Sequence, residues 1–151
     1  MTRLRVGLST CPNDTFLFHG LLTGQVSSPG LELDFVLADV EELNGALAQG
    51  RLEAGKASFA TALRLAERYG VLPVGAALGF GVGPVLLGRP GLQGEPRSVL
   101  CPGEGTTATL LLRALHPAHF AAAAVRQVRF DRILPALQRG EADAGVAIHA
   151  S

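Results

Sequence analysis

The stretch STCPNDTFLF, residues 9–18, lies between an apolar run at residues 4–8 and a segment with helical spacing that stops at Gly24. The apolar run predicts a short buried strand. Pro12 cannot continue a strand ladder, and it biases the residue before it toward an extended conformation. Asn13 and Asp14 favour the start of a helix, because their side-chain oxygens accept hydrogen bonds from unpaired backbone N–H groups. The stretch therefore predicts a strand, a tight polar turn and a helix.

This turn is also a candidate ligand site. In open α/β sheets, ligands bind at the carboxyl ends of the strands, and a helix N-terminus at that position favours anions. The alternative is an ordinary, well-capped connection between strand and helix, since such loops are common on protein surfaces. The turn by itself favours neither interpretation.

The rest of the chain repeats the alternation of strand and helix, which predicts an α/β fold with a largely parallel sheet. Asp39 and Glu42 have the spacing of a capping box and predict a helix that ends near Gly50. Further helices are expected at residues 59–69, 106–115 and 131–139. Strands are expected at residues 31–37, 52–58, 71–78, 84–87, 98–101, 125–130 and 143–148.

The segment GRPGLQGEP, residues 88–96, is the clearest interruption of this pattern. Glycine and proline dominate it, and no apolar period continues through it. We therefore expect a first α/β lobe over residues 1–90, a linker over residues 91–97 and a partial second α/β lobe over residues 98–151.

The composition excludes several classes of protein. The 151 residues are 48% hydrophobic and carry a formal net charge of +0, which favours a packed core and argues against a nucleic-acid partner. No apolar run approaches the roughly 20 residues of a membrane span, and no signal-peptide pattern precedes the first strand. Two cysteines are too few for a disulfide framework or a structural zinc site. We expect a cytoplasmic protein without a membrane span or a metal.

Two glycine-containing loops suggest phosphate or nucleotide sites. The run GFGVG at residues 79–83 leads into a proline and a strand rather than a helix, so it does not fit a dinucleotide-binding fingerprint, and we expect no nicotinamide or flavin site there. The run PGEGTT at residues 102–107 follows a strand and opens a helix, but it lacks the lysine of a Walker A loop. Thr106 and Thr107 offer hydroxyls beside free N–H groups to an anion, although a plain helix cap needs only one of them.

Two further side chains at strand ends are candidates for chemistry. Lys56 follows the third strand, where it is either a solvated charge or a cation for a substrate carboxylate. His149 follows the last strand, and an imidazole near its ordinary pKa suits proton abstraction near neutral pH, although a lone histidine is more often structural. We expect His19, His116 and His119 to have surface or packing roles, with the last two in a loop, and Cys11 to pack in its turn.

These motifs resemble those of the 1,4-dihydroxy-6-naphthoate synthase family of menaquinone biosynthesis. The resemblance rests on SxCPNDTF from residue 9, KxS from residue 56, GxGVGP from residue 79, PGxxTT from residue 102 and IH at residues 148–149. It implies a periplasmic-binding-protein-like fold of type II, with two α/β lobes and the substrate between them. It also implies a carbon–carbon lyase that converts cyclic dehypoxanthinylfutalosine to 1,4-dihydroxy-6-naphthoate without a cofactor. The residues it implicates are His149 as catalytic base and, for the substrate, Asn13, Asp14, Thr15, Lys56, Ala57, Ser58, Thr106 and Thr107.

The chain departs from the family at its end. Ala150 stands where the family has glutamate, and family members continue beyond Ser151 for about as long again. We therefore expect a homodimer or a missing C-terminal half, and an inactive chain when it is alone. Two alternatives stay open: chorismate dehydratase of the same pathway, which the CPNDTF and threonine-pair motifs disfavour, and a solute-binding protein without chemistry, which the lack of a signal peptide disfavours.

Overall fold

The computed structural model describes residues 1–76 and 79–148. The chain divides between residues 77 and 78 into two compact units, which we call unit 1 and unit 2. The elements of unit 1 are β1 (Thr2–Ser9), α1 (Pro12–Leu17), α2 (His19–Leu22), β2 (Leu31–Ala38), α3 (Val40–Ala48), β3 (Ala54–Gly55) and α4 (Phe59–Arg64). The elements of unit 2 are β4 (Val85–Gly88), β5 (Ser98–Cys101), α5 (Thr107–Leu115), α6 (Pro117–Ala122), β6 (Ala124–Gln127), the 3-10 helix η1 (Phe130–Arg132), α7 (Ile133–Gln138) and β7 (Ala144–Ala147).

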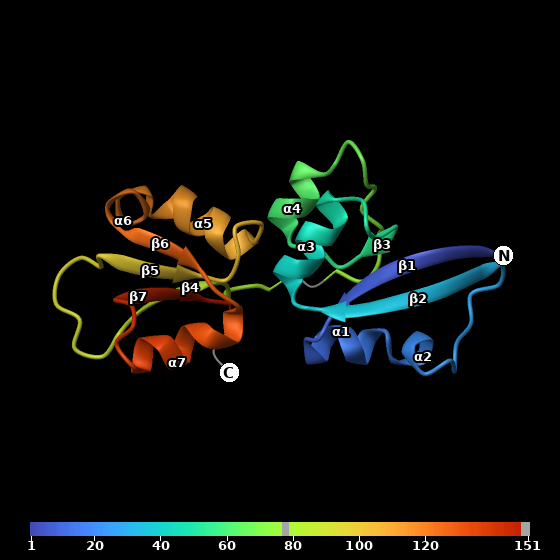
Figure 1. Ribbon diagram of the computed structural model, residues 1–151, viewed down its shortest axis with the longest axis horizontal. Helices are drawn as coiled ribbons and strands as arrows, with labels where there is room; N and C mark the ends of the chain where they lie inside the picture. The colour runs from blue at the N-terminus through green and yellow to red at the C-terminus, as the bar shows by residue number, and fades with distance from the viewer. Residues whose placement is uncertain (77–78, 149–151) are drawn as a thin grey trace. The chain divides into compact units, whose positions relative to one another are not determined.

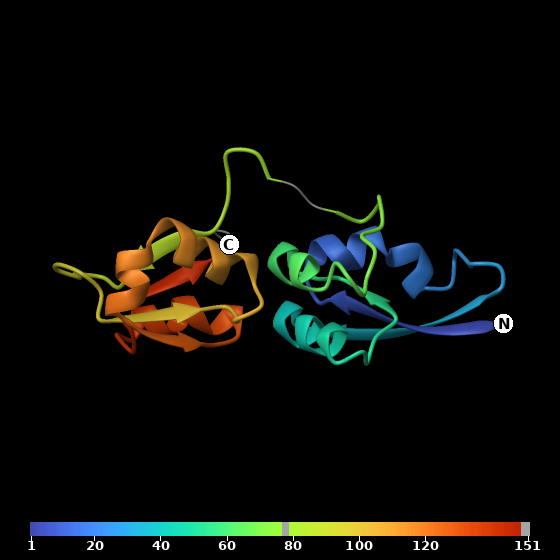
Figure 2. The same cartoon turned by 90° about the horizontal axis from the view of Figure 1, so that it is seen from above.

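Unit 1 is built on a parallel sheet with the strand order β2-β1-β3. Helix α3 covers one face of this sheet, while α1 and α2 lie on the other (Figure 1, Figure 2). The close approach of α3 depends on Gly7 in β1, because an added Cβ there would meet Leu43 and Leu52 at 2.7 Å. The buried apolar side chains on the α3 side of the sheet are Leu43, Ala46, Leu47 and Leu52.

The N-terminus of α3 is fixed by a capping box. The Asp39 side chain accepts a hydrogen bond from the Glu41 N–H at 2.9 Å, and the Glu42 carboxylate accepts one from the Asp39 N–H at 2.9 Å. Together they satisfy N–H groups that have no partner inside the helix. The capping box predicted from the sequence is confirmed.

Unit 2 has a mixed sheet with the order β4-β7-β5-β6, in which only β4 runs antiparallel to its neighbour. Helices α5 and α6 lie on one face of this sheet and α7 lies on the other (Figure 1). Strand β5 is therefore apolar on both sides, as a central parallel strand should be. Val99 and Cys101 pack with α5, and Leu100 packs with α7.

The division of the chain falls earlier than the lobe boundary expected near residue 90. Strand β4 pairs with β7, from Val85 opposite Ala147 to Gly88 opposite Ala144, so it belongs to unit 2. The expected linker at residues 91–97 is instead part of the loop between β4 and β5 within that unit (Figure 1). Composition identified a loop there correctly, but it carried no information about which strand β4 would pair with.

Several elements are shorter than the sequence predicts. The strand expected at residues 71–78 is wrong for its described part, because residues 71–76 form no strand. The apolar side chains of Val71, Leu72 and Val74 are exposed there rather than buried. The strand expected at residues 52–58 retains only two paired residues, and α4 ends well before residue 69. The loop expected around residue 119 is helical, since that residue lies in α6.

One carboxylate joins three strand ends of unit 2. Asp143, just before β7, accepts hydrogen bonds from Arg89 Nε at 3.0 Å, from the Arg97 N–H at 2.9 Å and from the Ser98 N–H at 3.2 Å. The Arg89 guanidinium and the two N–H groups hold the pKa of Asp143 below its ordinary value, because they stabilise the charged form. Asp143 thus connects the end of β4 and the start of β5 to the start of β7.

The packing of α7 against β7 gives a testable prediction. A Cβ added at Gly145 would lie 2.5 Å from Ile133 Cγ2 and 3.3 Å from Leu137 Cδ1, so Gly145→Ala should destabilise unit 2 by about 1–3 kcal/mol through overpacking. Gly45→Ala is the matched control, since Gly45 lies in α3 with nothing within 4 Å of an added Cβ. It should stabilise unit 1 by about 0.5–1 kcal/mol. Urea unfolding of both variants measures this, and equal stability of the two would contradict the described packing.

Candidate functional site

The carboxyl edge of the unit 1 sheet gathers polar side chains from three segments. Ser9 is the last residue of β1, Asp14 lies in the first turn of α1, and Lys56 directly follows β3. The parallel register brings the ends of β1 and β3 together, and the Lys56 N–H donates to the Gly7 carbonyl at 2.8 Å. Parallel pairing therefore places these three residues at one edge, where the sequence predicted a site.

Asp14 is the buried centre of this group. Its residue is only 4% exposed, and both carboxylate oxygens have partners. The Ser9 hydroxyl donates to Oδ2 at 2.6 Å, and Lys56 Nζ lies 2.9 Å from Oδ1. A buried carboxylate needs such compensation, because it has lost its hydration. Asp14 therefore does not serve as the helix cap suggested by its residue type; Cys11 occupies the N-cap position instead.

The Lys56 ammonium has a second partner in the same unit. Nζ donates a hydrogen bond to the backbone carbonyl of Gly75 at 3.2 Å, so it ties the segment after α4 to the sheet edge. The Lys56 side chain is 25% exposed, against 6% for that of Asp14. An ammonium has three N–H donors; one is donated to Gly75, and the Asp14 carboxylate lies in ion-pair contact with the nitrogen. The ammonium therefore lies at the boundary between the buried carboxylate and solvent.

The other predicted residues of unit 1 have different surroundings. Ser58 is the N-cap residue of α4 and exchanges two hydrogen bonds with buried Asn44, at 2.9 Å and 3.0 Å. Thr15 donates to carbonyls of its own turn, Asn13 is exposed, and Ala57 is half-buried. The structure thus brings Asp14 and Lys56 into direct contact, while Ser58 belongs to a separate pair with Asn44.

The loop of unit 2 between β5 and α5 is organised by Gly103. The backbone of this residue has a φ of 137°, a conformation that residues other than glycine rarely adopt. Its carbonyl accepts hydrogen bonds from the hydroxyls of Thr106 at 2.7 Å and Thr109 at 2.6 Å. Thr106 Oγ1 also accepts from the Thr109 N–H at 3.3 Å, as an N-cap should. Thr106 is only 2% exposed, so its hydroxyl acts inside the loop.

Thr107 has a more accessible place than its neighbour. It is the first residue of α5 and is half-buried, at a helix N-terminus that follows the carboxyl end of β5. The same loop is held from β6, because Gln127 accepts from the Gly103 N–H at 3.0 Å and donates to Glu104 at 3.1 Å. Glu104 also pairs with Arg113 at 2.5 Å. The backbone around this N-terminus is therefore fixed by side chains from two elements.

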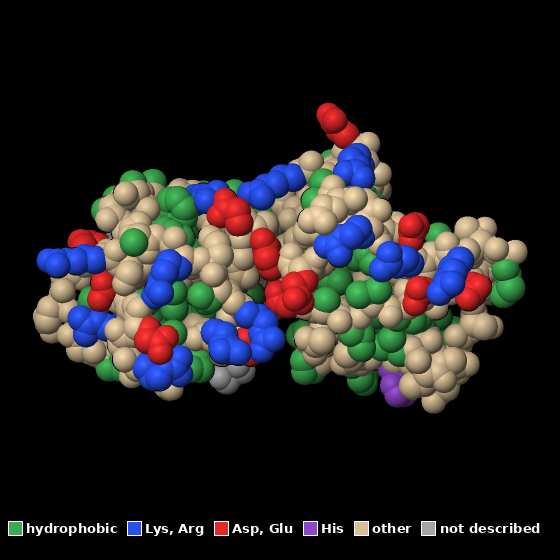
Figure 3. Space-filling view, viewed as in Figure 1, with side chains coloured by type: hydrophobic (Ala, Val, Ile, Leu, Met, Phe, Trp, Pro, Cys, Tyr) green, Lys and Arg blue, Asp and Glu red, His purple; other side chains and the backbone are tan. Residues whose placement is uncertain are grey.

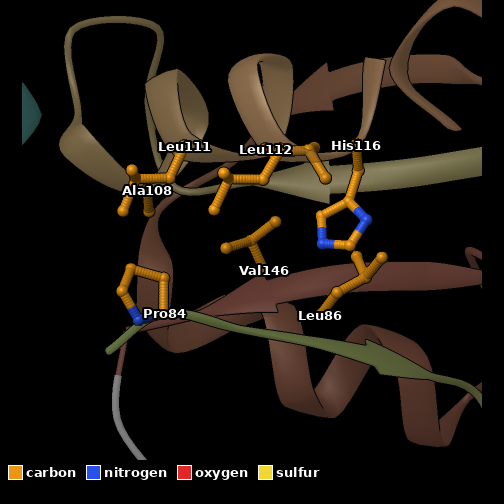
Figure 4. A pocket seen from close by; sticks show the side chains of 8 residues that line it. Pro84, Leu86, Ala108, Leu111, Leu112, His116 and Val146 are labelled. Carbon is orange, nitrogen blue, oxygen red and sulfur yellow. The ribbon is translucent and has the colours of Figure 1, made fainter. Parts of the chain in front are cut away.

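Unit 2 also contains a small apolar hollow of about 70 Å³ between α5 and the strands β4 and β7. Figure 4 shows Ala108, Leu111 and Leu112 above Leu86 and Val146, with the His116 ring at one end. None of the predicted site residues within residues 1–76 and 79–148 lines it. Its size suits a small apolar group, and its lining belongs to the packing of α5 on the sheet.

No three His, Cys, Asp or Glu side chains within residues 1–76 and 79–148 are grouped so as to hold a metal ion. Basic and acidic side chains are interspersed on the face shown in Figure 3.

Burial raises the pKa of the Cys101 thiol, and this outweighs the hydrogen bond with Thr109. In the described part of the chain, no helix is long and apolar enough to cross a membrane.

Sequence reasoning missed the residues that support the site. Ser9, Asn44 and Gln127 each hold a predicted residue or loop; Asn44 and Gln127 belong to no motif, and Ser9 opens the SxCPNDTF motif without being predicted as a site residue. Ser9 had one available signal, since it ends a buried strand directly before the polar turn. His149, the predicted catalytic base, lies outside the described residues.

Comparison with known proteins supplies a family. Residues 4–151 match the family described as menaquinone biosynthesis. The 1,4-dihydroxy-6-naphthoate synthase of Thermus thermophilus is 46% identical over 152 residues, which cover 100% of this chain and 54% of that enzyme. The enzyme of the same name from Streptomyces coelicolor is 39% identical over 153 residues, covering 97% of this chain and 52% of its own length. The chain thus spans about half the length of these curated relatives, and the predicted resemblance is confirmed.

Solved structures support the fold. Protein AF1704 from Archaeoglobus fulgidus superposes with a TM-score of 0.86 at 31% identity, covering 97% of this chain and 54% of that one. The alkanesulfonate-binding protein SsuA from Xanthomonas axonopodis pv. citri superposes with a TM-score of 0.64 at 18% identity, covering 98% and 55%. At 18% identity, the similarity to SsuA is evidence for the fold alone. Together they confirm the predicted α/β fold of the periplasmic-binding-protein type.

The cap of α5 gives a prediction for Thr106. Thr106→Ala should lower the free energy of unfolding of unit 2 by about 1 kcal/mol, because it removes the N-cap acceptor and a donor to the Gly103 carbonyl. Thr106→Ser retains the hydroxyl, so its free energy of unfolding should fall much less. Thermal and urea unfolding of the two variants test this. An alanine variant as stable as the parent chain would exclude the capping role.

The two cysteines give a second prediction. Cys101 is buried with a raised thiol pKa, whereas Cys11 is half-buried. Because alkylation requires the thiolate and access to it, iodoacetamide should modify Cys11 at least about 10-fold faster than Cys101 in the native protein. Mass spectrometry of the modified peptides measures both rates, and full unfolding in denaturant should make them similar. Equal rates in the native protein would contradict the burial of Cys101.

Proposed function

We propose a function from the premise that the chain belongs to the menaquinone biosynthesis family: it forms part of a 1,4-dihydroxy-6-naphthoate synthase. The observation that carries this proposal is the 46% identity to the Thermus thermophilus enzyme over 100% of this chain. Because the chain spans about half the length of that enzyme, the complete activity is proposed for the protein that contains this sequence. We also propose that this protein is located in the cytoplasm, as expected for a biosynthetic enzyme of this kind.

The proposed reaction is a lyase step that converts cyclic dehypoxanthinylfutalosine to 1,4-dihydroxy-6-naphthoate. His149 is the proposed general base, since the resemblance assigns that role to it and a neutral imidazole can take up a proton near pH 7. No cofactor is included in the proposal. The protein's part in this step is to bind and orient the substrate and to remove one proton.

Binding is proposed for residues of both units. In unit 1, the candidates are the Lys56 to Ser58 segment together with Asn13 and Thr15 of the turn, whose Asp14 contacts Lys56. In unit 2, Thr107 is the accessible member of the threonine pair, and its place at the N-terminus of α5 suits an anionic or hydroxyl group. Thr106 supports that site through its hydrogen bond to Gly103.

The proposal is tested by turnover. The protein that contains this chain should convert cyclic dehypoxanthinylfutalosine to 1,4-dihydroxy-6-naphthoate, measured by chromatography of the product. His149→Asn should lower kcat by roughly 10²–10⁴-fold with substrate binding nearly intact, since a positioned base contributes about that much. His19→Asn is the matched control, because His19 is an exposed histidine of α2, and its kcat should be unchanged.

Three outcomes would change the proposal. Binding of the substrate without turnover would favour a solute-binding protein of the same fold. Turnover of chorismate in place of the futalosine derivative would favour the dehydratase of the same pathway. Normal turnover by His149→Asn would retain the reaction but remove His149 from the mechanism.

A further inference from the structure

We propose that Ser9 and Asp14 are positioning residues for the Lys56 ammonium, which offers a ligand one N–H donor from a charge-neutralised pair. The ligand group that this arrangement suits is a hydroxyl or carbonyl oxygen. This assigns to Lys56 a role different from the carboxylate anchor expected from the sequence. The identity of the ligand rests on the proposed function, whereas the positioning itself rests on the geometry of unit 1.

The first argument is that both oxygens of Asp14 already have partners and its side chain is buried. Oδ1 lies 2.9 Å from Lys56 Nζ, and Oδ2 accepts from the Ser9 hydroxyl at 2.6 Å. The Ser9 oxygen in turn accepts from the Cys11 N–H at 3.2 Å. With its side chain only 6% exposed, Asp14 is placed to act through Lys56 rather than on a substrate directly.

The second argument is the charge. A carboxylate in contact with the ammonium cancels most of its field at the distance of a further ligand atom, since the two opposite charges act there as a dipole. A carboxylate ligand would gain little from such a pair and would be repelled by Asp14. A neutral oxygen acceptor gains the hydrogen bond without that repulsion. The pair therefore distinguishes ligand groups by their charge.

The third argument is the choice of residue. Lys56 is the sole lysine of the 151-residue sequence, in which the 13 Lys and Arg residues are otherwise all arginine. All the other positively charged side chains of this sequence are thus arginines. A compact ammonium can direct separate donors at the Asp14 carboxylate and the Gly75 carbonyl, whereas the planar fork of arginine fixes its donors in one plane. The geometry calls for an ammonium at this position.

The fourth argument is the donor count. Lys56 Nζ donates a hydrogen bond to the Gly75 carbonyl and lies in ion-pair contact with Asp14, and the side chain remains 25% exposed. Within residues 1–76 and 79–148 these are the polar contacts of the ammonium, which has three N–H donors, so its exposed side can offer one to a ligand. A ligand oxygen there would complete the tetrahedral coordination of the ammonium.

The first test is a double-mutant cycle on the protein that contains this chain. Asp14→Asn should raise KM for cyclic dehypoxanthinylfutalosine about 10-fold with kcat nearly unchanged, and Lys56→Met should do at least as much. In the Lys56→Met background, Asp14→Asn should change KM less than about 2-fold, because a residue that acts through Lys56 has nothing left to position. A similar loss in both backgrounds would overturn the proposal. Ser9→Ala, which leaves the ion pair in place, gives a milder variant whose effect should vanish in the same way.

The second test needs no substrate. Peptide mass spectrometry follows the acetylation of the Lys56 amine by acetic anhydride in the protein that contains this chain, and the acetylation ratio is the rate in a variant divided by the rate in the parent protein. Asp14→Asn should raise this ratio to several-fold above one. Asp34→Asn is the matched control, since Asp34 pairs with Arg3 on the exposed surface, and its ratio should stay close to one.

The two tests separate the possible failures. Absence of turnover in the parent protein would reject the proposed function, and the acetylation ratio would still decide whether Asp14 holds Lys56. Turnover combined with an additive cycle would reject the positioning role and retain the function. An acetylation ratio close to one for Asp14→Asn, in a variant whose melting temperature shows it to be folded, would overturn the positioning outright.

Discussion

A carboxylate that is buried away from water is stable only with hydrogen bonds and an opposite charge inside the protein. In unit 1, the buried carboxylate of Asp14 has this requirement. Its partners come from the end of β1 and from the residue after β3, and the lysine that neutralises it also holds the carbonyl of Gly75. The sheet edge, the first helix and the segment after α4 are thus joined through one buried charge. Loss of Lys56 would leave the Asp14 carboxylate buried without an opposite charge, which costs more than the pair itself contributes.

In unit 2, the residue at the centre of the loop after β5 is held by neutral groups. The carbonyl of Gly103 receives two threonine hydroxyls, and Gln127 takes up the N–H of the same residue. Hydroxyls and amides cost less to bury than ions, so the loop can lie against a core that contains the fully buried Cys101. The two units therefore present different chemistry at their strand ends: a neutralised ion pair in one, and a helix N-terminus with supporting hydroxyls in the other.

Local patterns predicted the local structure well. The strand, turn and helix around Pro12, the capping box at Asp39 and the strand-loop-helix at Thr106 are all present, because each depends on residues within a few positions of one another. Pairings between distant segments were not predictable in this way. The contact of Asp14 with Lys56, the exchange between Asn44 and Ser58, and the pairing of β4 with β7 depend on the sheet register, which a single sequence does not reveal. The apolar residues 71–76 show the converse error, since hydrophobicity predicted a strand where the chain is exposed.

The strand order of unit 2 has a consequence for folding during synthesis. Strand β7 pairs with both β4 and β5, yet it is the last of the four to leave the ribosome. Until β7 emerges, β4 has no partner in the sheet. Asp143, whose carboxylate accepts hydrogen bonds from Arg89 and Arg97, emerges only directly before β7. The β2-β1-β3 sheet of unit 1 is complete once β3 has been made. The nascent chain should therefore carry a folded first unit and an incomplete second one, in which the edge of β5 that later pairs with β7 is still unpaired.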